Sequence, residues 1–239
     1  MPPARATRRS PQPTAPAAPV SRARRPAGGR ATPGTVVVLV RHGNTPTTGK
    51  LLPGRAAGLH LSELGRAQAE GVAARIAELP RAPSAVYASP LERTRETAAP
   101  IARALGLRVR SARGLIECDV GAWTGESLAR VSKLPEWADV QRWPSGFRFP
   151  GGESFSEMWS RVNDAIVGLV GDHRGETVVV VSHADPIRAV VAGATGVPLD
   201  LFQRVVVSPC SVSTLWFGPG GPHVLCVNST GSLKDLALS

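Results

Sequence analysis

Val36-Val37-Val38-Leu39-Val40-Arg41-His42-Gly43 is the stretch of this 239-residue chain that decides its fold. Its first five residues form an unbroken apolar, mostly β-branched run, which is typical of a strand buried on both faces of a sheet. A second run of this kind, residues 177–181, leads directly into Ser182 and His183. Ligands of parallel α/β sheets bind beyond the carboxyl ends of the strands, so the two histidines are expected to meet at that edge.

Strand-like and helix-like segments alternate around these two strands. A helical pattern is expected from Ser62, its N-cap, to about Leu79, and Ser154 is expected to cap a helix that runs to about Val170. The alternation predicts an α/β domain of three layers, α/β/α, with a largely parallel central sheet. Further strands are expected at 85–89, 108–110, 211–217 and 224–228, further helices at 90–105 and 186–193, and irregular or partly helical chain at 124–150.

The charge of the chain is unevenly distributed. The formal net charge is +10, but residues 1–33 hold seven of the 28 Lys and Arg residues and no acidic residue. The remainder has 21 basic against 18 acidic residues, which suits a small anionic ligand and argues against a nucleic-acid partner. Residues 1–33 are rich in Pro, Ala and Arg, and they are predicted to be a disordered tail because they cannot bury enough apolar surface. A nucleic-acid-binding arm, a transit peptide and an over-extended start before a domain at 34–239 stay open as interpretations of this tail.

The cysteines indicate a reducing compartment. Cys118, Cys210 and Cys226 are far apart, odd in number and without metal-ligand spacing, so they are predicted to be free thiols. No apolar segment approaches the roughly 18 residues of a membrane span, and the first residues lack the apolar core of a secretory signal. We therefore expect a cytoplasmic protein with no membrane partner, either a monomer or a homodimer.

Charged side chains that suit a phosphoryl group accompany the two histidines. Arg41 precedes His42, and Arg93 follows the strand expected at 85–89, in the first turns of a helix. Guanidinium groups match phosphate oxygens as bidentate donors, although Arg93 taken alone could equally form a surface ion pair. Glu117 could supply a proton, because a carboxyl group beside a bound dianion has its charged form disfavoured. Taken alone, Glu117 could equally be a solvated loop residue.

Six short segments in a fixed order place these residues in a wider pattern. They are Arg-His-Gly at 41–43, Leu-Ser-Glu-Leu-Gly at 61–65, Ser-Pro-Leu-x-Arg-x-x-x-Thr-Ala at 89–98, Leu-x-Glu-x-x-x-Gly-x-Trp-x-Gly at 115–125, Pro-Gly-Gly-Glu-Ser at 150–154 and Val-Val-Ser-His at 180–183. With them the chain resembles the histidine phosphatase superfamily, also called the phosphoglycerate mutase-like family, from about Val36 to Asn228. The three residues at 41–43 alone recur by chance, whereas six ordered matches are specific. The resemblance implies the phosphoglycerate mutase-like fold.

The resemblance also implies a role for each catalytic candidate. His42 corresponds to the nucleophile that takes up the phosphoryl group, and Arg41, Arg93 and His183 correspond to the pocket that holds phosphate. Glu117 corresponds to the acid that protonates the leaving oxygen and then activates water or another acceptor. No metal ion or other cofactor is implied, because the cationic side chains take the part that magnesium has at other phosphoryl-transfer sites.

Four further positions are candidates for contact with the substrate. They are Asn44, Thr45, Thr48 and Arg148. Many family members have Glu at position 44 and a phosphate-binding Asn at position 48, so these departures could shift substrate preference. Arg148 corresponds to a position that touches substrate in some sugar-phosphate members. Ala184 replaces the usual Gly after the second histidine, which narrows the floor of the pocket.

The resemblance leaves open where the phosphoryl group goes. The segment between Glu117 and His183 is modest and the chain ends soon after its last expected strand, so we expect an open pocket that admits water. This favours a phosphatase acting on a small phosphorylated metabolite. A phosphoglycerate mutase-type enzyme, which must shield its phosphohistidine from water, is the alternative. A non-catalytic scaffold of the same fold is the third, and the presence of all five catalytic side chains argues against it.

The remaining notable residues are expected to be structural. Gly43 is expected to let the backbone turn and let a substrate approach closely. His60, His173 and His223 are expected to face solvent, and Cys118 to be a packed thiol. The Trp residues at 123–143 are expected to form the packed edge of a lid.

Overall fold

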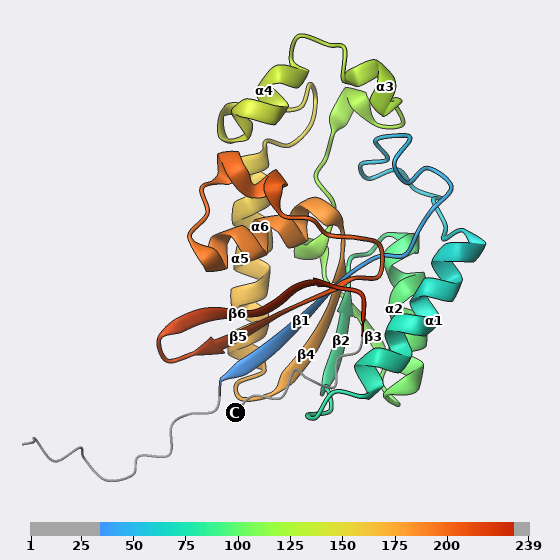
Figure 1. The fold of residues 1–239 in the computed structure, drawn as a ribbon, viewed down its shortest axis with the longest axis vertical. Helices are drawn as coiled ribbons and strands as arrows, with labels where there is room; N and C mark the ends of the chain where they lie inside the picture. Colours follow the sequence, from blue (N-terminus) through green and yellow to red (C-terminus); the bar gives the residue numbers. More distant parts are fainter. Residues whose placement is uncertain (1–33, 232–239) are drawn as a thin grey trace, which may run out of the picture. The chain divides into compact units, whose positions relative to one another are not determined.

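The computed structural model describes residues 34–231, so the tail at 1–33 that was predicted to be disordered lies outside the described residues. Within them the chain forms a six-stranded sheet in the order β3-β2-β4-β1-β5-β6 (Figure 1). None of the helices in this part of the chain has both the length and the apolar character needed to cross a bilayer. The strands are β1 Thr35–Arg41, β2 Ala85–Ala88, β3 Val109–Ser111, β4 Thr177–Ser182, β5 Val212–Gly218 and β6 Gly221–Ser229.

Strands β1 and β4 lie side by side in the centre of the sheet. They pair in parallel, with Arg41 opposite Ser182. Strands β2 and β3 extend the parallel part on one side, and β5 and β6 add an antiparallel pair on the other. The predicted, largely parallel sheet is therefore confirmed. Because of this register, the next residues, His42 and His183, leave the sheet from neighbouring positions.

Helices cover both faces of the sheet and complete the three predicted layers (Figure 1). Val37 and Leu39 of β1 pack in a core with residues of α5 and α6, whereas Val36 and Val38 pack in a second core with residues of α1 and α2. All four are at most 7% exposed, which is why residues 36–40 of this strand are all apolar. The helices are α1 Glu63–Ala77, α2 Glu92–Ala104, α5 Phe155–Asp172 and α6 Ala184–Thr195.

Serine residues begin two of these helices where the sequence predicts them. The Ser62 hydroxyl accepts a hydrogen bond from the Gly65 N–H at 3.0 Å. Ser154 forms a capping box with Glu157, in which each side chain accepts from the backbone N–H of the other. Both helices therefore start from a local hydrogen-bond pattern that a sequence reveals directly.

Several predicted features differ in the structure. Helix α6 begins at Ala184 and ends at Thr195, two residues beyond each predicted bound. Helix α2 begins at Glu92 rather than at Pro90, because the residue before Glu92 has an extended backbone. His173, expected to face solvent, is buried. Its Nε2 lies 3.0 Å from the Tyr87 hydroxyl and its Nδ1 lies 2.7 Å from a Glu176 carboxylate oxygen. Long-range hydrogen bonding to β2 therefore turns this histidine inward.

Residues 121–150 lie beyond the carboxyl ends of the strands, at the top of Figure 1. They contain two short helices, α3 Leu128–Val131 and α4 Trp137–Arg142, joined by irregular chain. The Trp123 ring centroid lies 5.7 Å from that of Phe147 and 5.5 Å from that of Phe149, and all three rings are buried. Trp143 is 59% exposed instead. The prediction of a packed aromatic edge thus holds for Trp123 and is wrong for Trp143.

Candidate active site

His42 directly follows β1, and its backbone N–H donates to the Ser182 carbonyl at 2.9 Å. Its imidazole is buried, and Nδ1 lies 2.8 Å from the Gly43 carbonyl oxygen. Because a carbonyl can only accept, Nδ1 carries the hydrogen and Nε2 keeps its lone pair. Burial, together with the charges of Arg93 and Arg41, lowers the pKa of His42 to about 3. Near pH 7 the ring is therefore neutral, and Nε2 is a competent nucleophile.

Gly43 is needed for a different reason from the one predicted. Its φ is not in the left-handed region, so no turn requires glycine here. A Cβ at Gly43 would instead lie 2.5 Å from the Gly65 carbonyl oxygen, and a Cβ at Gly65 would lie 2.0 Å from that of Asn44. The Gly43 N–H also donates to the Thr97 hydroxyl at 3.0 Å. The loop after β1 is thus packed backbone to backbone against the start of α1 and tied to α2.

His183 follows β4 and faces His42, as the strand pattern predicts. The two ring centroids are 5.2 Å apart with an edge-on geometry. His183 Nε2 lies 2.8 Å from the Ser89 hydroxyl, whereas Nδ1 has no partner. The hydroxyl can donate to Nε2, which leaves the hydrogen on Nδ1. Burial lowers the pKa of His183 well below its usual value, so this ring is also neutral near pH 7.

Arg93 and Arg41 carry buried donors that have no hydrogen-bond partner within residues 34–231. Arg93 is fully buried, which excludes the surface ion pair that the sequence left open. Its Nη2 donates to the Gly54 carbonyl at 2.8 Å, whereas its Nε and Nη1 have no hydrogen-bond partner. Arg41 Nη1 donates to the Val207 carbonyl at 2.6 Å and its Nε has no partner. Buried donors of this kind are costly unless an acceptor completes them. Together with Nδ1 of His183 they form a site that suits an oxyanion beside His42.

Glu117 adds an acid to this group. Its Oε2 lies 4.0 Å from His183 Nδ1, and its Oε1 accepts from the Cys118 N–H at 2.9 Å. Burial and then the charge of Asp185 raise the pKa of Glu117 to about 7, against the opposing effects of the Cys118 N–H and the two guanidiniums. A carboxyl group that titrates near neutrality can both donate a proton and take one back.

A second charged network fixes the loop that carries Glu117. Arg55 Nε donates to the Glu117 carbonyl at 2.8 Å, and Arg161 Nη1 donates to the Ile116 carbonyl at 3.0 Å. Glu153 pairs with both of these guanidiniums at 2.9 Å. The Pro-Gly-Gly-Glu-Ser segment therefore supports Glu117 indirectly, because its Glu153 pairs with the two arginines that donate to the backbone carbonyls at 116 and 117.

Several of these contacts were not predicted from the sequence. Ser89 and Glu153 lie inside two of the six ordered segments. The sequence therefore marks these two positions as part of the family pattern, but it does not reveal what their side chains contact. Arg55 and Arg161 lie in an irregular loop and in the middle of α5, where Arg is ordinarily a solvated residue. Only the folded chain shows that they face the loop of Glu117.

Of the four predicted substrate contacts, three lie in the loop that follows His42 and one lies at the surface. The Asn44 Oδ1 accepts from the Ser62 hydroxyl at 2.9 Å, and the hydroxyls of Thr45 and Thr48 lie 3.0 Å apart in the same loop. These three residues are thus near His42 in the chain but engaged with one another or with α1. Arg148 is exposed, pairs with Glu157 and donates to the Gly152 carbonyl, so the structure does not bring it to the site.

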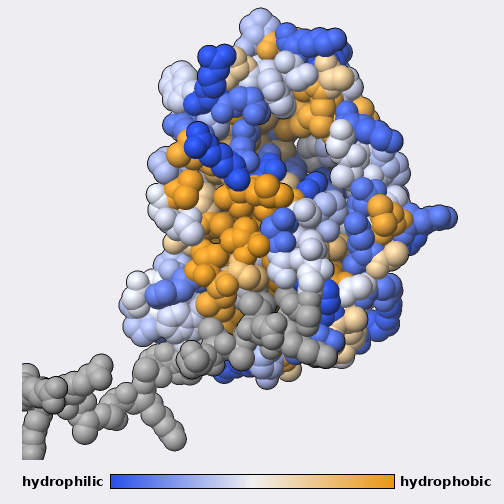
Figure 2. Space-filling view, in the orientation of Figure 1, coloured by the Kyte–Doolittle hydropathy of each residue, from blue (hydrophilic) through white to orange (hydrophobic). Residues whose placement is uncertain are grey.

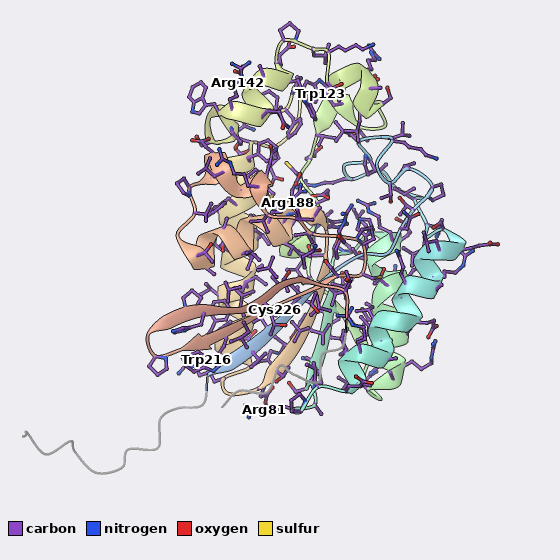
Figure 3. The ribbon with its side chains drawn as sticks, viewed as in Figure 1. Arg81, Trp123, Arg142, Arg188, Trp216 and Cys226 are labelled. Atoms are coloured by element: carbon purple, nitrogen blue, oxygen red, sulfur yellow. The ribbon has the colours of Figure 1, made fainter. Side chains whose placement is uncertain are left out.

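The recess above the carboxyl edge of the sheet is visible in Figure 2, below the 121–150 region. Hydrophilic and hydrophobic side chains both border it on this face. In the view of Figure 3, Arg188 of α6 lies below Trp123 and above Cys226 of β6. The chemical groups described above come from the strand ends and helix starts that meet at this edge.

Comparison with known proteins identifies the same pattern. A model of the histidine phosphatase superfamily (branch 1) matches residues 37–230. Phosphoserine phosphatase 1 of Hydrogenobacter thermophilus is 37% identical over 207 residues, which cover 83% of this chain and 94% of that protein. The metal-independent phosphoserine phosphatase of Arabidopsis thaliana is 35% identical over 163 residues, which cover 65% of this chain and 67% of that protein. The solved structure of mycobacterial glucosyl-3-phosphoglycerate phosphatase superposes with a TM-score of 0.74 and 26% identity, covering 84% of this chain and all of that one.

Proposed function

The chain belongs to the histidine phosphatase superfamily, and from that premise we propose that it hydrolyses a small phosphate monoester through a phosphohistidine on His42. The observation that carries the proposal is the hydrogen bond of His42 to the Gly43 carbonyl, in which Nδ1 lies 2.8 Å from the oxygen. Because Nδ1 carries the hydrogen, the free lone pair of the ring is on Nε2. A neutral, buried imidazole beside unpartnered cationic donors is what attack on a phosphoryl group requires.

In the first step Nε2 of His42 attacks phosphorus, and the bond from phosphorus to the leaving oxygen breaks. Arg41, Arg93 and Nδ1 of His183 take the three equatorial oxygens, whose charge grows in the transition state. The Glu117 carboxyl gives its proton to the leaving oxygen, so the product leaves as a neutral alcohol. The enzyme is left with a phosphohistidine and a Glu117 carboxylate.

In the second step water attacks the phosphorus of the phosphohistidine. The Glu117 carboxylate removes a proton from that water as the bond from Nε2 to phosphorus breaks. Inorganic phosphate leaves, and His42 and Glu117 return to their starting protonation states. The sum of both steps is one ester and one water converted to one alcohol and one phosphate.

The substrate proposal is a small metabolite with a single phosphate ester, and phosphoserine is its first candidate. Two of the relatives described above are named phosphoserine phosphatases, and the superposed structure is a phosphatase of glucosyl-3-phosphoglycerate. Those names describe these relatives. They support including phosphoserine and phosphorylated three-carbon acids in a substrate panel for this chain.

The experiment is a phosphate-release assay with that panel and p-nitrophenyl phosphate, with and without EDTA. We expect hydrolysis that EDTA does not reduce, an acid-labile phosphoenzyme after rapid quenching, and loss of both with His42→Ala. Arg103→Ala is the matched control, because Arg103 is exposed and pairs with Glu70 on α1. No release from any ester and no phosphoenzyme would overturn the proposal. Conversion of 3-phosphoglycerate to its 2-isomer faster than phosphate release would assign a mutase instead.

A further inference from the structure

The peptide group between Val207 and Ser208 is hydrogen-bonded on both of its sides. Its carbonyl oxygen accepts from Nη1 of Arg41 at 2.6 Å, and its N–H donates to Oδ1 of Asn228 at 2.6 Å. The C=O and N–H of a trans peptide lie in one plane and point in opposite directions. The bond to Asn228 therefore fixes the direction in which this carbonyl meets Arg41.

Asn228 lies in a bulge of β6, next to the point where this strand ends. Between Val212 and Thr214 of β5, the paired positions on β6 move from Ser229 to Cys226, so β6 carries one extra residue there. Asn228 has a φ of 55°, a left-handed conformation that asparagine adopts at less cost than most residues. A bulge redirects a side chain out of the regular alternation of a strand, and here the redirected side chain reaches the Ser208 N–H.

The backbone around Asn228 is held from two directions. The Asn228 N–H donates to the Ser213 hydroxyl of β5 at 3.1 Å. The carbonyl of the next residue, Ser229, accepts from Nη2 of Arg75 on α1 at 3.0 Å. Two neighbouring elements thus fix the residue that in turn holds the Val207–Ser208 peptide group.

The Arg41 side chain depends on this peptide group for its orientation. Within residues 34–231 its guanidinium donates to the Val207 carbonyl, whereas its buried Nε meets no acceptor. Because a guanidinium is planar and its donors have a fixed geometry, holding Nη1 also sets the directions of Nε and Nη2. Those are the donors that remain for phosphate oxygens.

We propose that Asn228 is a positioning residue of the phosphate site. Through the Val207–Ser208 peptide group it orients Arg41, so that the remaining donors of the guanidinium face the phosphoryl oxygens beside His42. Asn228 itself does not touch the substrate in this arrangement. This inference deepens the proposed function and rests on it.

The test compares two substitutions at the same position. Asn228→Gly keeps the left-handed backbone without strain and removes the acceptor for the Ser208 N–H. Asn228→Asp is the matched control, because it retains a side-chain oxygen at the same distance along the chain and tolerates the same backbone. In calorimetric titration, the dissociation constant of inorganic phosphate should rise about tenfold in Asn228→Gly and stay within about threefold of wild type in Asn228→Asp. The value of kcat/KM for an ester substrate should fall in parallel.

A double-mutant cycle with Arg41→Ala separates positioning from general loosening of the structure. If Asn228 acts through Arg41, adding Asn228→Gly to Arg41→Ala should weaken phosphate binding by less than about twofold. The same tenfold loss in both backgrounds would overturn the inference, because it would mean that the phosphate site is disturbed by another route. Equal losses in Asn228→Gly and Asn228→Asp would also overturn it.

The orientation of Arg41 is read without ligand or turnover from its Nε–H signal in nitrogen–proton correlation spectra. The signal is assigned by its absence in Arg41→Ala. It should be retained in Asn228→Asp and be broadened or shifted in Asn228→Gly. An unchanged signal in Asn228→Gly refutes the role of Asn228 even if no ester proves to be a substrate. An inactive wild type whose Arg41 signal still responds to Asn228→Gly would instead remove the proposed function alone.

Discussion

Replacing Glu117 by Gln should make the protein inactive and, above pH 7, more stable. Burial and Asp185 raise the pKa of Glu117 from its ordinary 4.5 to about 7. A raised folded-state pKa means that stability present below pH 4.5 is lost as the pH rises to 7, because the folded chain must then hold a charge on a side chain that is only 15% exposed. Raising the pKa from 4.5 to about 7, at about 1.4 kcal/mol per pH unit, corresponds to a penalty of about 3 kcal/mol at pH 8. Gln has nearly the same shape, retains the acceptor for the Cys118 N–H and carries no charge.

The assay is urea unfolding of wild type and Glu117→Gln at several pH values from 4.5 to 8.5. The difference in the free energy of unfolding should rise in favour of the variant across this range, by about 3 kcal/mol, or roughly 6–12 °C in Tm for a domain of this size. Groups that do not interact with Glu117 titrate alike in both proteins and cancel in the difference. A difference that stays constant with pH would refute the reasoning, because it would mean that the carboxyl is not held in its neutral form by its surroundings.

Two further substitutions test the packing and orientation of the site. Gly65→Ala should destabilise the protein by about 1–3 kcal/mol in thermal unfolding and sharply lower kcat, because its Cβ would lie 2.0 Å from the Asn44 carbonyl oxygen. The control is Gly71→Ala on the same helix, whose Cβ would meet no described atom within 4 Å. This variant should be neutral or more stable by up to about 1 kcal/mol. Ser89→Ala removes the only hydrogen-bond partner that the His183 imidazole has within residues 34–231, and it should lower kcat about tenfold with little change in KM. An unchanged kcat would show that the ring is oriented by packing alone.

The central part of the fold follows from local patterns in the sequence. The apolar run of β1 predicts a strand buried on both faces because every one of its side chains enters a core. Ser62 and Ser154 predict helix starts because a serine hydroxyl three residues before a backbone N–H is a complete local motif. The meeting of His42 and His183 follows from two strands that end in the same way and pair in parallel.

What could not be predicted depends on contacts between distant segments. The turn containing His173 is polar, and only its hydrogen bond to Tyr87 shows that it is buried. Arg148 was predicted to reach the substrate, but the Glu157 that completes the capping box of α5 holds it at the surface. The clamp on the Glu117 backbone requires Arg55 and Arg161 to converge from segments far apart in sequence, and no periodic pattern records such a convergence.

The parallel register between β1 and β4 has a consequence for how this protein can evolve. Arg41 lies opposite Ser182, so deletion of one residue from either strand would separate His42 from His183 and turn every side chain of that strand toward the wrong core. The 121–150 region supplies no strand to the sheet that residues 34–231 form, and it lies beyond the strand edge (Figure 1). A change in its length would leave the pairing of β1 with β4 in register, so we expect insertions and deletions there to keep the two histidines together. The placement of the two histidines is therefore inherited with the register, while the length of the chain beyond the strand edge is not bound by it.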